Sequence, residues 1–272
     1  MSAIEYSYDA VGNRTQKVEN GITTTYVYDA ANQLVQSQTG SSTTTYLYDL
    51  NGNLLSETTG SSVTSYEWDE ENRLAKVTYP DGSSEEYIYS ADGLRKKKVV
   101  TNAASVSETT LFLWDGQNVL LETDENKNLK ARYTNAPDEY APMLSMQRGA
   151  VVSHYGFDTL SNARVLVDDS QSVTDSYTYS GFGQEQSSSG TTANPHRFGG
   201  EVGYYADKLS RIYIRARHYQ PQNGRWMSND PIGYDGGDGN LYRYVQNNPV
   251  SDVDPRGLAP TDRLSSRAKV LG

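Results

Sequence analysis

The sequence predicts an all-β protein built from repeated antiparallel hairpins, and three observations support this fold class. An aromatic pair followed by Asp recurs every 20 residues, in copies that begin at Tyr6, Tyr26, Tyr46 and Tyr66. Residues that favour turns separate the copies, as at Asn20-Gly21. The 272-residue chain also has 22 Tyr but only 4 Phe. Tyr and Thr favour strands with one wet face, so this bias fits sheet rather than helix.

Each repeat is expected to fold as strand, turn, strand, turn. One set of turn signals lies between the copies, and a second set follows each Asp: Gly12-Asn13, Asn32, Gly52-Asn53 and Asn72. Because side chains alternate along a strand, Tyr46 should stack between Tyr26 and Tyr66 in a ladder. The Asp of each copy should bind the amides of its own turn. Units of this length form extended arrays. Because this chain has only a handful of repeats, we expect them to make an open, curved sheet or a self-associated assembly.

The repeats and a shift in composition distinguish two parts of the chain. Residues 1–183 are the repeat region, and residues 184–194 are rich in Ser, Thr and Gly and are expected to form a flexible loop. Within the repeats, the basic run Leu94–Lys98 is expected to be a solvated strand end, with a specific anion site as the alternative.

Charge and composition exclude several functions. The net charge of −10 disfavours nucleic acid and anionic membranes as partners, because both require basic patches. There is no Cys, so disulfides and thiolate metal sites are excluded. No apolar run is long enough for a membrane span, and the first residues lack a signal-peptide pattern.

No metal or cofactor is expected. The segment Asp235-Gly-Gly-Asp-Gly-Asn240 is rich in Asp and Gly, but it lacks the alternating ligands and terminal Glu of a calcium loop, so a glycine turn is preferred. His154, His196 and His218 lie far apart, without zinc-ligand spacing. Phosphate-loop and dinucleotide fingerprints are absent. A Ser-His-Asp triad stays open, although there is no Gly-x-Ser-x-Gly elbow.

Two Asp-Pro-x-Gly boxes stand out near the C-terminus, Asp230-Pro-Ile-Gly233 and Asp254-Pro-Arg-Gly257. Proline fixes φ and the glycine permits a sharp turn, so each box should hold its Asp at a rigid corner. Two carboxyls brought together can divide the roles of acid and base. By residue type alone, the alternative is a pair of ordinary turns in which each Asp caps its own loop.

A series of motifs occurs in order along the C-terminal region: Arg197-Phe-Gly-Gly200, Tyr213-Ile-Arg-Ala-Arg-His-Tyr219, Gly224-Arg-Trp226, Asp230-Pro-Ile-Gly233, Asn240-Leu-Tyr-Arg-Tyr-Val245, Asn247-Asn-Pro-Val250 and Asp254-Pro-Arg-Gly-Leu258. Together they resemble the core-associated domain of Rhs/YD-repeat proteins. The resemblance implies that residues 195–258 are a separate domain and that residues 259–272 form a tail, which is too short to fold alone. In that family the domain ends a shell of YD repeats and cuts its own chain, which releases a variable C-terminal toxin.

The resemblance implies specific residues for this chain. Asp230 and Asp254 would be the catalytic pair, and the scissile bond would join Leu258 to Ala259. Arg225 matches an arginine upstream of the first box and would orient or stabilise a carboxylate. Three aromatic residues between and beside the boxes are expected to pack around the pair and exclude water: Trp226, Tyr242 and Tyr244.

Two classes of function follow. In the first, the chain is the C-terminal part of an Rhs shell and an aspartyl protease acting once in cis, with its own C-terminal segment as substrate. In the second, it is a non-enzymatic scaffold or surface-binding module, whose Tyr ladders contact sugars or partner proteins. The resemblance further implies a bacterial protein, secreted or at the cell surface, that joins a larger toxin assembly or associates with itself.

Overall fold

The repeat region forms a single antiparallel sheet of 18 strands. The computed structural model describes residues 3–208 and 211–262. The strands are β1 (Ile4–Tyr8), β2 (Arg14–Glu19), β3 (Ile22–Tyr28), β4 (Leu34–Thr39), β5 (Ser42–Tyr48), β6 (Leu54–Thr59), β7 (Ser62–Trp68), β8 (Leu74–Thr78), β9 (Ser84–Tyr89), β10 (Arg95–Thr101), β11 (Ser107–Asp115), β12 (Asn118–Thr123), β13 (Leu129–Asn135), β14 (Met143–Arg148), β15 (Val151–Phe157), β16 (Ala163–Val167), β17 (Val173–Tyr179) and β18 (Glu185–Ser189). Each strand pairs with the next along the chain, as in β1 with β2 and β17 with β18. The predicted all-β repeat sheet is confirmed.

The Asp of each repeat ties its turn as the sequence indicates. In the first repeat, Oδ1 of Asp9 accepts hydrogen bonds from the amides of Val11 and Asn13, at 3.1 and 2.8 Å. The Asn13 side chain donates to Oδ1 of Asn32 in the next repeat, at 2.9 Å. The turns are therefore linked to one another along one edge of the sheet.

From the second repeat onward, the first aromatic of each pair is buried and belongs to the inner ladder. Tyr26, Tyr46 and Tyr66 are at most 7% exposed and pack in one cluster with the leucines of the returning strands. The residue between the two aromatics points outward, and Val27 and Leu47 are 50% and 64% exposed. The period-2 alternation of the strand thus places one stripe inside and one outside.

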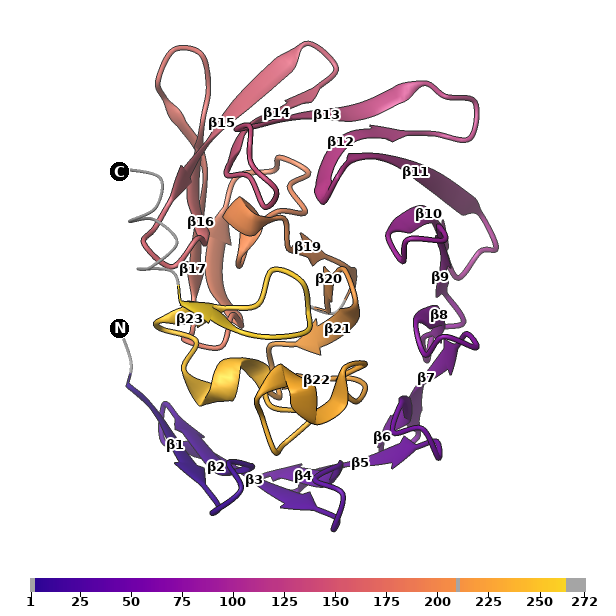
Figure 1. Cartoon of the computed structure of the whole chain (residues 1–272), viewed down its shortest axis with the longest axis vertical. Helices are drawn as coiled ribbons and strands as arrows, with labels where there is room; N and C mark the ends of the chain where they lie inside the picture. The colour runs from indigo at the N-terminus through magenta and orange to yellow at the C-terminus, as the bar shows by residue number, and fades with distance from the viewer. Residues whose placement is uncertain (1–2, 209–210, 263–272) are drawn as a thin grey trace.

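The C-terminal segment lies inside the curve of the sheet (Figure 1). It contains the four-stranded sheet β19 (Tyr205–Ala206), β20 (Ile212–Ile214), β21 (Arg217–Gln220) and β22 (Arg225–Trp226), the pair β23 (Asp252–Val253) and β24 (Thr261–Asp262), and the 3₁₀ turns η1 (Gly200–Val202), η3 (Gly233–Gly236) and η4 (Tyr244–Asn247).

Hydrogen bonds join this segment to both ends of the sheet. Arg225 donates to Asn13 beside β2, and Tyr219 donates to the carbonyl of Phe182 beside β18. The strand registers described here contain no pairing of β1 with β18. The sheet is therefore open at this seam, and the C-terminal segment fills its interior. No helix in the described part of the chain is long and apolar enough to cross a membrane.

Part of the segment expected as a flexible loop is the last strand of the sheet. Residues 185–189 form β18, which pairs with β17. Two of the Ser residues that suggested a loop, Ser187 and Ser189, hydrogen-bond through their side chains to Thr178 and Ser176 of β17, at 2.7 and 2.8 Å. Their hydroxyl groups form hydrogen bonds on a solvent-exposed face of the sheet. For residues 185–189, the Ser-rich composition therefore wrongly indicated a loop.

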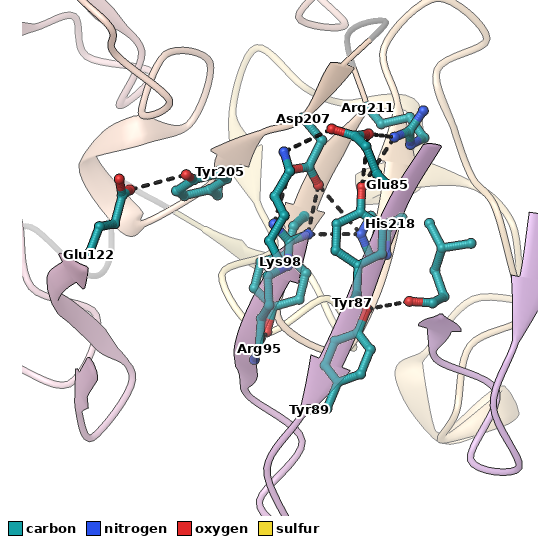
Figure 2. A network of polar contacts seen from close by, with 12 residues as sticks. Glu85, Tyr87, Tyr89, Arg95, Lys98, Glu122, Tyr205, Asp207, Arg211 and His218 are labelled. Atoms are coloured by element: carbon teal, nitrogen blue, oxygen red, sulfur yellow. Dashed lines mark hydrogen bonds and ion pairs between the residues drawn. The ribbon is translucent and has the colours of Figure 1, made fainter. Parts of the chain in front are cut away.

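The expectation that the basic run Leu94–Lys98 is solvated is wrong for Arg95 and Lys98, although Lys96 is exposed. The guanidinium of Arg95 is fully buried and binds both carboxylate oxygens of Asp207, at 3.0 and 2.6 Å (Figure 2). Lys98 binds Asp207 and Glu85, at 2.8 and 2.9 Å. Burial alone would raise the pKa of Asp207, but Arg95 and Lys98 outweigh it and hold that pKa well below its usual range. The run therefore joins the shell to the C-terminal segment.

Candidate functional site

The two Asp-Pro boxes meet at one buried arginine. Nη2 of Arg217, on β21, lies 2.8 Å from Oδ2 of Asp230 and 3.5 Å from Oδ2 of Asp254. Its guanidinium carbon lies 4.0 Å from the ring centre of Trp226. A single cation, stacked on an aromatic ring, thus joins two carboxyls that are 24 residues apart in the sequence.

Each box also forms the local turn that its residues predict. In the first, the amide of Ile232 donates to Oδ1 of Asp230 at 3.1 Å. In the second, the amide of Leu258 donates to Oδ1 of Asp254 at 3.0 Å. Gly257 has a φ of +71°, and a Cβ there would collide with the carbonyl oxygen of Ile214. Only glycine lets the second box pack this closely against β20.

The Leu258–Ala259 bond lies in the loop between β23 and β24, which pair Val253 with Thr261. The amide of Leu258 donates to Oδ1 of Asp254 at 3.0 Å, and the amide of Ala259 is close enough to this carboxyl to help lower its pKa. The carbonyl oxygen of Leu258 and Oδ2 of Asp230 lie 2.9 and 3.0 Å from the place where a Cβ of Gly236 would stand. The nitrogen side of the bond is therefore next to Asp254, and its carbonyl is in the neighbourhood of Asp230.

A small cavity of about 10 Å³ adjoins these groups. Its lining includes Arg217, Trp226, Asp230, Asp254 and Leu258. A space of this size has room for about one water molecule, and its polar lining could hold one.

Burial sets the protonation of the pair. It raises the pKa of Asp254 to about 6, although Arg217 and the backbone amides oppose it. Burial also raises the pKa of Asp230, and Arg217 again opposes the rise. The largest cause for both carboxyls is the loss of solvent, and repulsion between the two is not among the main causes. Asp254 thus keeps a protonated fraction close to neutral pH.

Arg225 lies in another part of the structure. It is buried, donates to Oδ1 of Asn13 at 3.0 Å and to the carbonyl of Asn32, and its guanidinium lies over Tyr28. Arg217 occupies the position beside the carboxyls, and the sequence analysis did not single it out. A signal was available, since Arg217 is a charged residue within the apolar and aromatic strand motif of residues 213–219.

The three aromatic residues expected around the pair take different positions. Trp226 lines the cavity and is 2% exposed. Tyr244 packs on Trp226 with ring centres 5.5 Å apart, one contact away from the carboxyls. Tyr242 packs edge-on against Tyr48 of the shell and donates to the carbonyl of Gly52 at 2.8 Å.

The histidines do not gather at this site. His154 is bonded to Asp169 at the surface, and His196 binds the carbonyl of Tyr204. Burial lowers the pKa of His218 to about 4, so it is neutral beside Asp207. Within residues 3–208 and 211–262, no group of three or more His, Cys, Asp or Glu is placed to hold a metal ion.

A curved sheet of repeats that surrounds its own C-terminal segment, with paired Asp boxes at the end, defines a repeat-shell protein. The RHS Repeat family model matches residues 48–84. The chain is 31% identical over 197 residues to the tRNA3(Ser)-specific nuclease WapA of Bacillus spizizenii, covering 69% of this chain and 8% of WapA. It is 50% identical over 58 residues to the toxin subunit YenC2 of Yersinia entomophaga, covering 21% and 6% of the two chains.

The fold agrees with these matches. The crystal structure of TcdB2-TccC3 superposes with a TM-score of 0.58 at 19% identity, covering 95% of this chain and 17% of that one. The chain belongs to the Rhs/YD-repeat proteins and shares their shell-type fold. It spans about a tenth or less of the length of the two curated relatives.

Proposed function

We propose that this chain is the C-terminal part of an Rhs shell and that it cleaves its own backbone once, between Leu258 and Ala259. The observation that supports the proposal best is the convergence of Asp230 and Asp254 on Arg217, beside the peptide bond named by the family resemblance. The reaction would be hydrolysis in cis by an aspartyl pair, which releases the segment that starts at Ala259.

The geometry supports distinct roles for the two carboxyls. Asp230 has the closer contact to Arg217, which favours its ionised form, so it acts as the base. It takes a proton from a water in the adjoining cavity, and the resulting hydroxide attacks the carbonyl carbon of Leu258. Asp254, whose pKa is about 6, gives its proton to the nitrogen of Ala259 as the C–N bond breaks. The products are a carboxyl group on Leu258 and an amine on Ala259.

The fold holds the scissile bond beside the two carboxyls, so the reaction does not depend on affinity for a separate substrate. The bond is covalently tethered to Asp254 and held between β23 and β24, so no binding step is required. Arg217 orients both carboxyls and offsets their burial. Trp226 excludes water from one side of the guanidinium, which strengthens its electrostatic effect on both acids.

The proposal also covers the larger assembly in which this shell would act. The likeness to a TcdB2-TccC3 complex supports a place for this chain in a larger toxin assembly, with the segment after Leu258 as its cargo. The interior of the described sheet is filled by the C-terminal segment. Enclosure of a folded cargo therefore requires shell beyond the residues described here.

Intact mass of freshly expressed protein tests the proposal. Wild type should lack residues 259–272, whereas Asp230→Asn and Asp254→Asn should each keep them, because each change removes one member of a pair that acts as a unit. Asp-Pro bonds are labile to acid, so the cut must be mapped: breakage before Pro231 or Pro255 would reflect that lability. A wild type that keeps its tail would make the chain a non-enzymatic scaffold. An Asn variant that loses the tail as fast as wild type would refute the aspartyl mechanism.

A further inference from the structure

One turn of the shell touches the loop that carries Asp230. The turn of residues 49–53, called here the Gly52 turn, accepts two hydrogen bonds from the C-terminal segment. A third hydrogen bond to that segment is made by Leu54, directly after the turn. The side chain of Asn229 donates to the carbonyl of Asn51 at 2.9 Å, and Tyr242 donates to the carbonyl of Gly52 at 2.8 Å. The amide of Leu54 donates to the carbonyl of Met227 at 2.9 Å. Asn229 immediately precedes Asp230.

Glycine at position 52 is required by this close approach rather than by the turn. Gly52 has a φ of +83°, but Asn32 and Asn72 fill the same place in neighbouring repeats with φ of 62° and 59°. Asn tolerates this left-handed conformation. A Cβ at residue 52 would, however, collide with Nδ2 of Asn229 and lie 2.5 Å from the hydroxyl of Tyr242. Any side chain at residue 52 therefore requires the side chains of Asn229 and Tyr242 to move away from the turn.

We propose that the Gly52 turn positions Asp230 for self-cleavage, by direct contact of Gly52 with Asn229 and Tyr242. This inference rests on the proposed function, and it makes Gly52 a positioning residue on the shell. Pro231 restricts the backbone of Asp230 on one side, and the hydrogen bond from Asn229 to the Gly52 turn holds the loop on the other side. Cleavage then depends on the third repeat being packed against the C-terminal segment, which links release of the tail to folding of the shell.

The test compares Gly52→Asn with Gly93→Asn. Gly93 has the same φ of +83° in a turn of the same kind, but nothing lies within 4 Å of the place of its Cβ. Both variants therefore carry the same backbone change, and only the first should displace Asn229. In timed cell-free synthesis, Gly52→Asn should slow loss of the tail by roughly 10- to 100-fold, the effect expected of a misplacement of about 1 Å. Gly93→Asn should cleave like wild type.

Two further measurements separate positioning from stability. Gly52→Asn should move the acid side of the pH profile of cleavage to lower pH, because a loosened loop lets water reach Asp230, the base, whose pKa is raised by burial. A loss of stability alone would lower the amount of folded protein without moving the profile. Amide hydrogen exchange of residues 228–238 should also rise in Gly52→Asn and stay unchanged in Gly93→Asn.

The outcomes distinguish this inference from the proposed function. If Gly52→Asn matches Gly93→Asn in both cleavage and exchange, the positioning role is refuted while self-cleavage stands. If wild type keeps its tail, self-cleavage is refuted, and the exchange of residues 228–238 then decides whether the Gly52 turn holds the Asp230 loop.

Discussion

Replacing Asp254 with Asn should stabilise the folded chain at neutral pH while it abolishes cleavage. Asp254 is 2% exposed, and burial raises its pKa from the ordinary 3.8 to about 6. Folding therefore takes up a proton between these two values. The unfolded chain binds fewer protons there, so stability falls as pH rises through this window and the loss is complete above it.

The structure gives the size of the effect. A rise of about two pKa units corresponds to about 3 kcal/mol of folding free energy lost above about pH 6. Asn keeps the size of the side chain and an oxygen that can accept the amide of Leu258, so the local turn should survive. The cost of burying a charge is removed, and the variant should be more stable at pH 7 by an amount of this order.

Urea denaturation at a series of pH values measures how the unfolding free energy depends on pH. Asp230→Asn is the matched reference, because it too should keep the tail and it retains the Asp254 carboxyl. The unfolding free energy of Asp230→Asn should fall by about 3 kcal/mol from about pH 4 to about pH 7, and that of Asp254→Asn should fall by less. Equal slopes for the two variants would show that Asp254 is not the titrating group, and the assignment of Asp254 as the acid would fail with it.

Other substitutions test the site, its packing and its link to the shell. Arg217→Met keeps the length of the side chain but leaves both carboxyls buried without a cation, so their pKa values should rise further and the rate of tail loss should drop by at least ~100-fold. Trp226→Ala should lower the unfolding free energy by ~3–5 kcal/mol, and a urea-denaturation change below about 0.5 kcal/mol would contradict its burial. Asp207→Asn leaves Arg95 buried without its carboxylate and should cost ~3–5 kcal/mol in the same assay. The exposed Asp169, changed in the same way, should have no comparable effect.

The sequence by itself determined the repeat sheet. The 20-residue spacing, the turn residues and the Asp after each aromatic pair are local signals, and they act through hydrogen bonds within a few residues, as between Asp9 and Asn13. The alternation that buries Tyr26 and exposes Val27 is local too. The two Asp-Pro boxes were visible for the same reason, since each is a turn whose shape its own residues dictate.

Only the tertiary structure decided which charges meet. Arg217 and Arg225 lie only eight residues apart and each precedes a ring-bearing residue. Yet Arg217 reaches the carboxyls and Arg225 reaches the turn of Asn13. Arg95 looked solvated because its partner Asp207 is 112 residues away. The requirement for Gly52 arises from a segment more than 170 residues further along the chain. Such contacts form only when the sheet curves around the C-terminal segment, because burial, not local spacing, selects the partner of a buried charge.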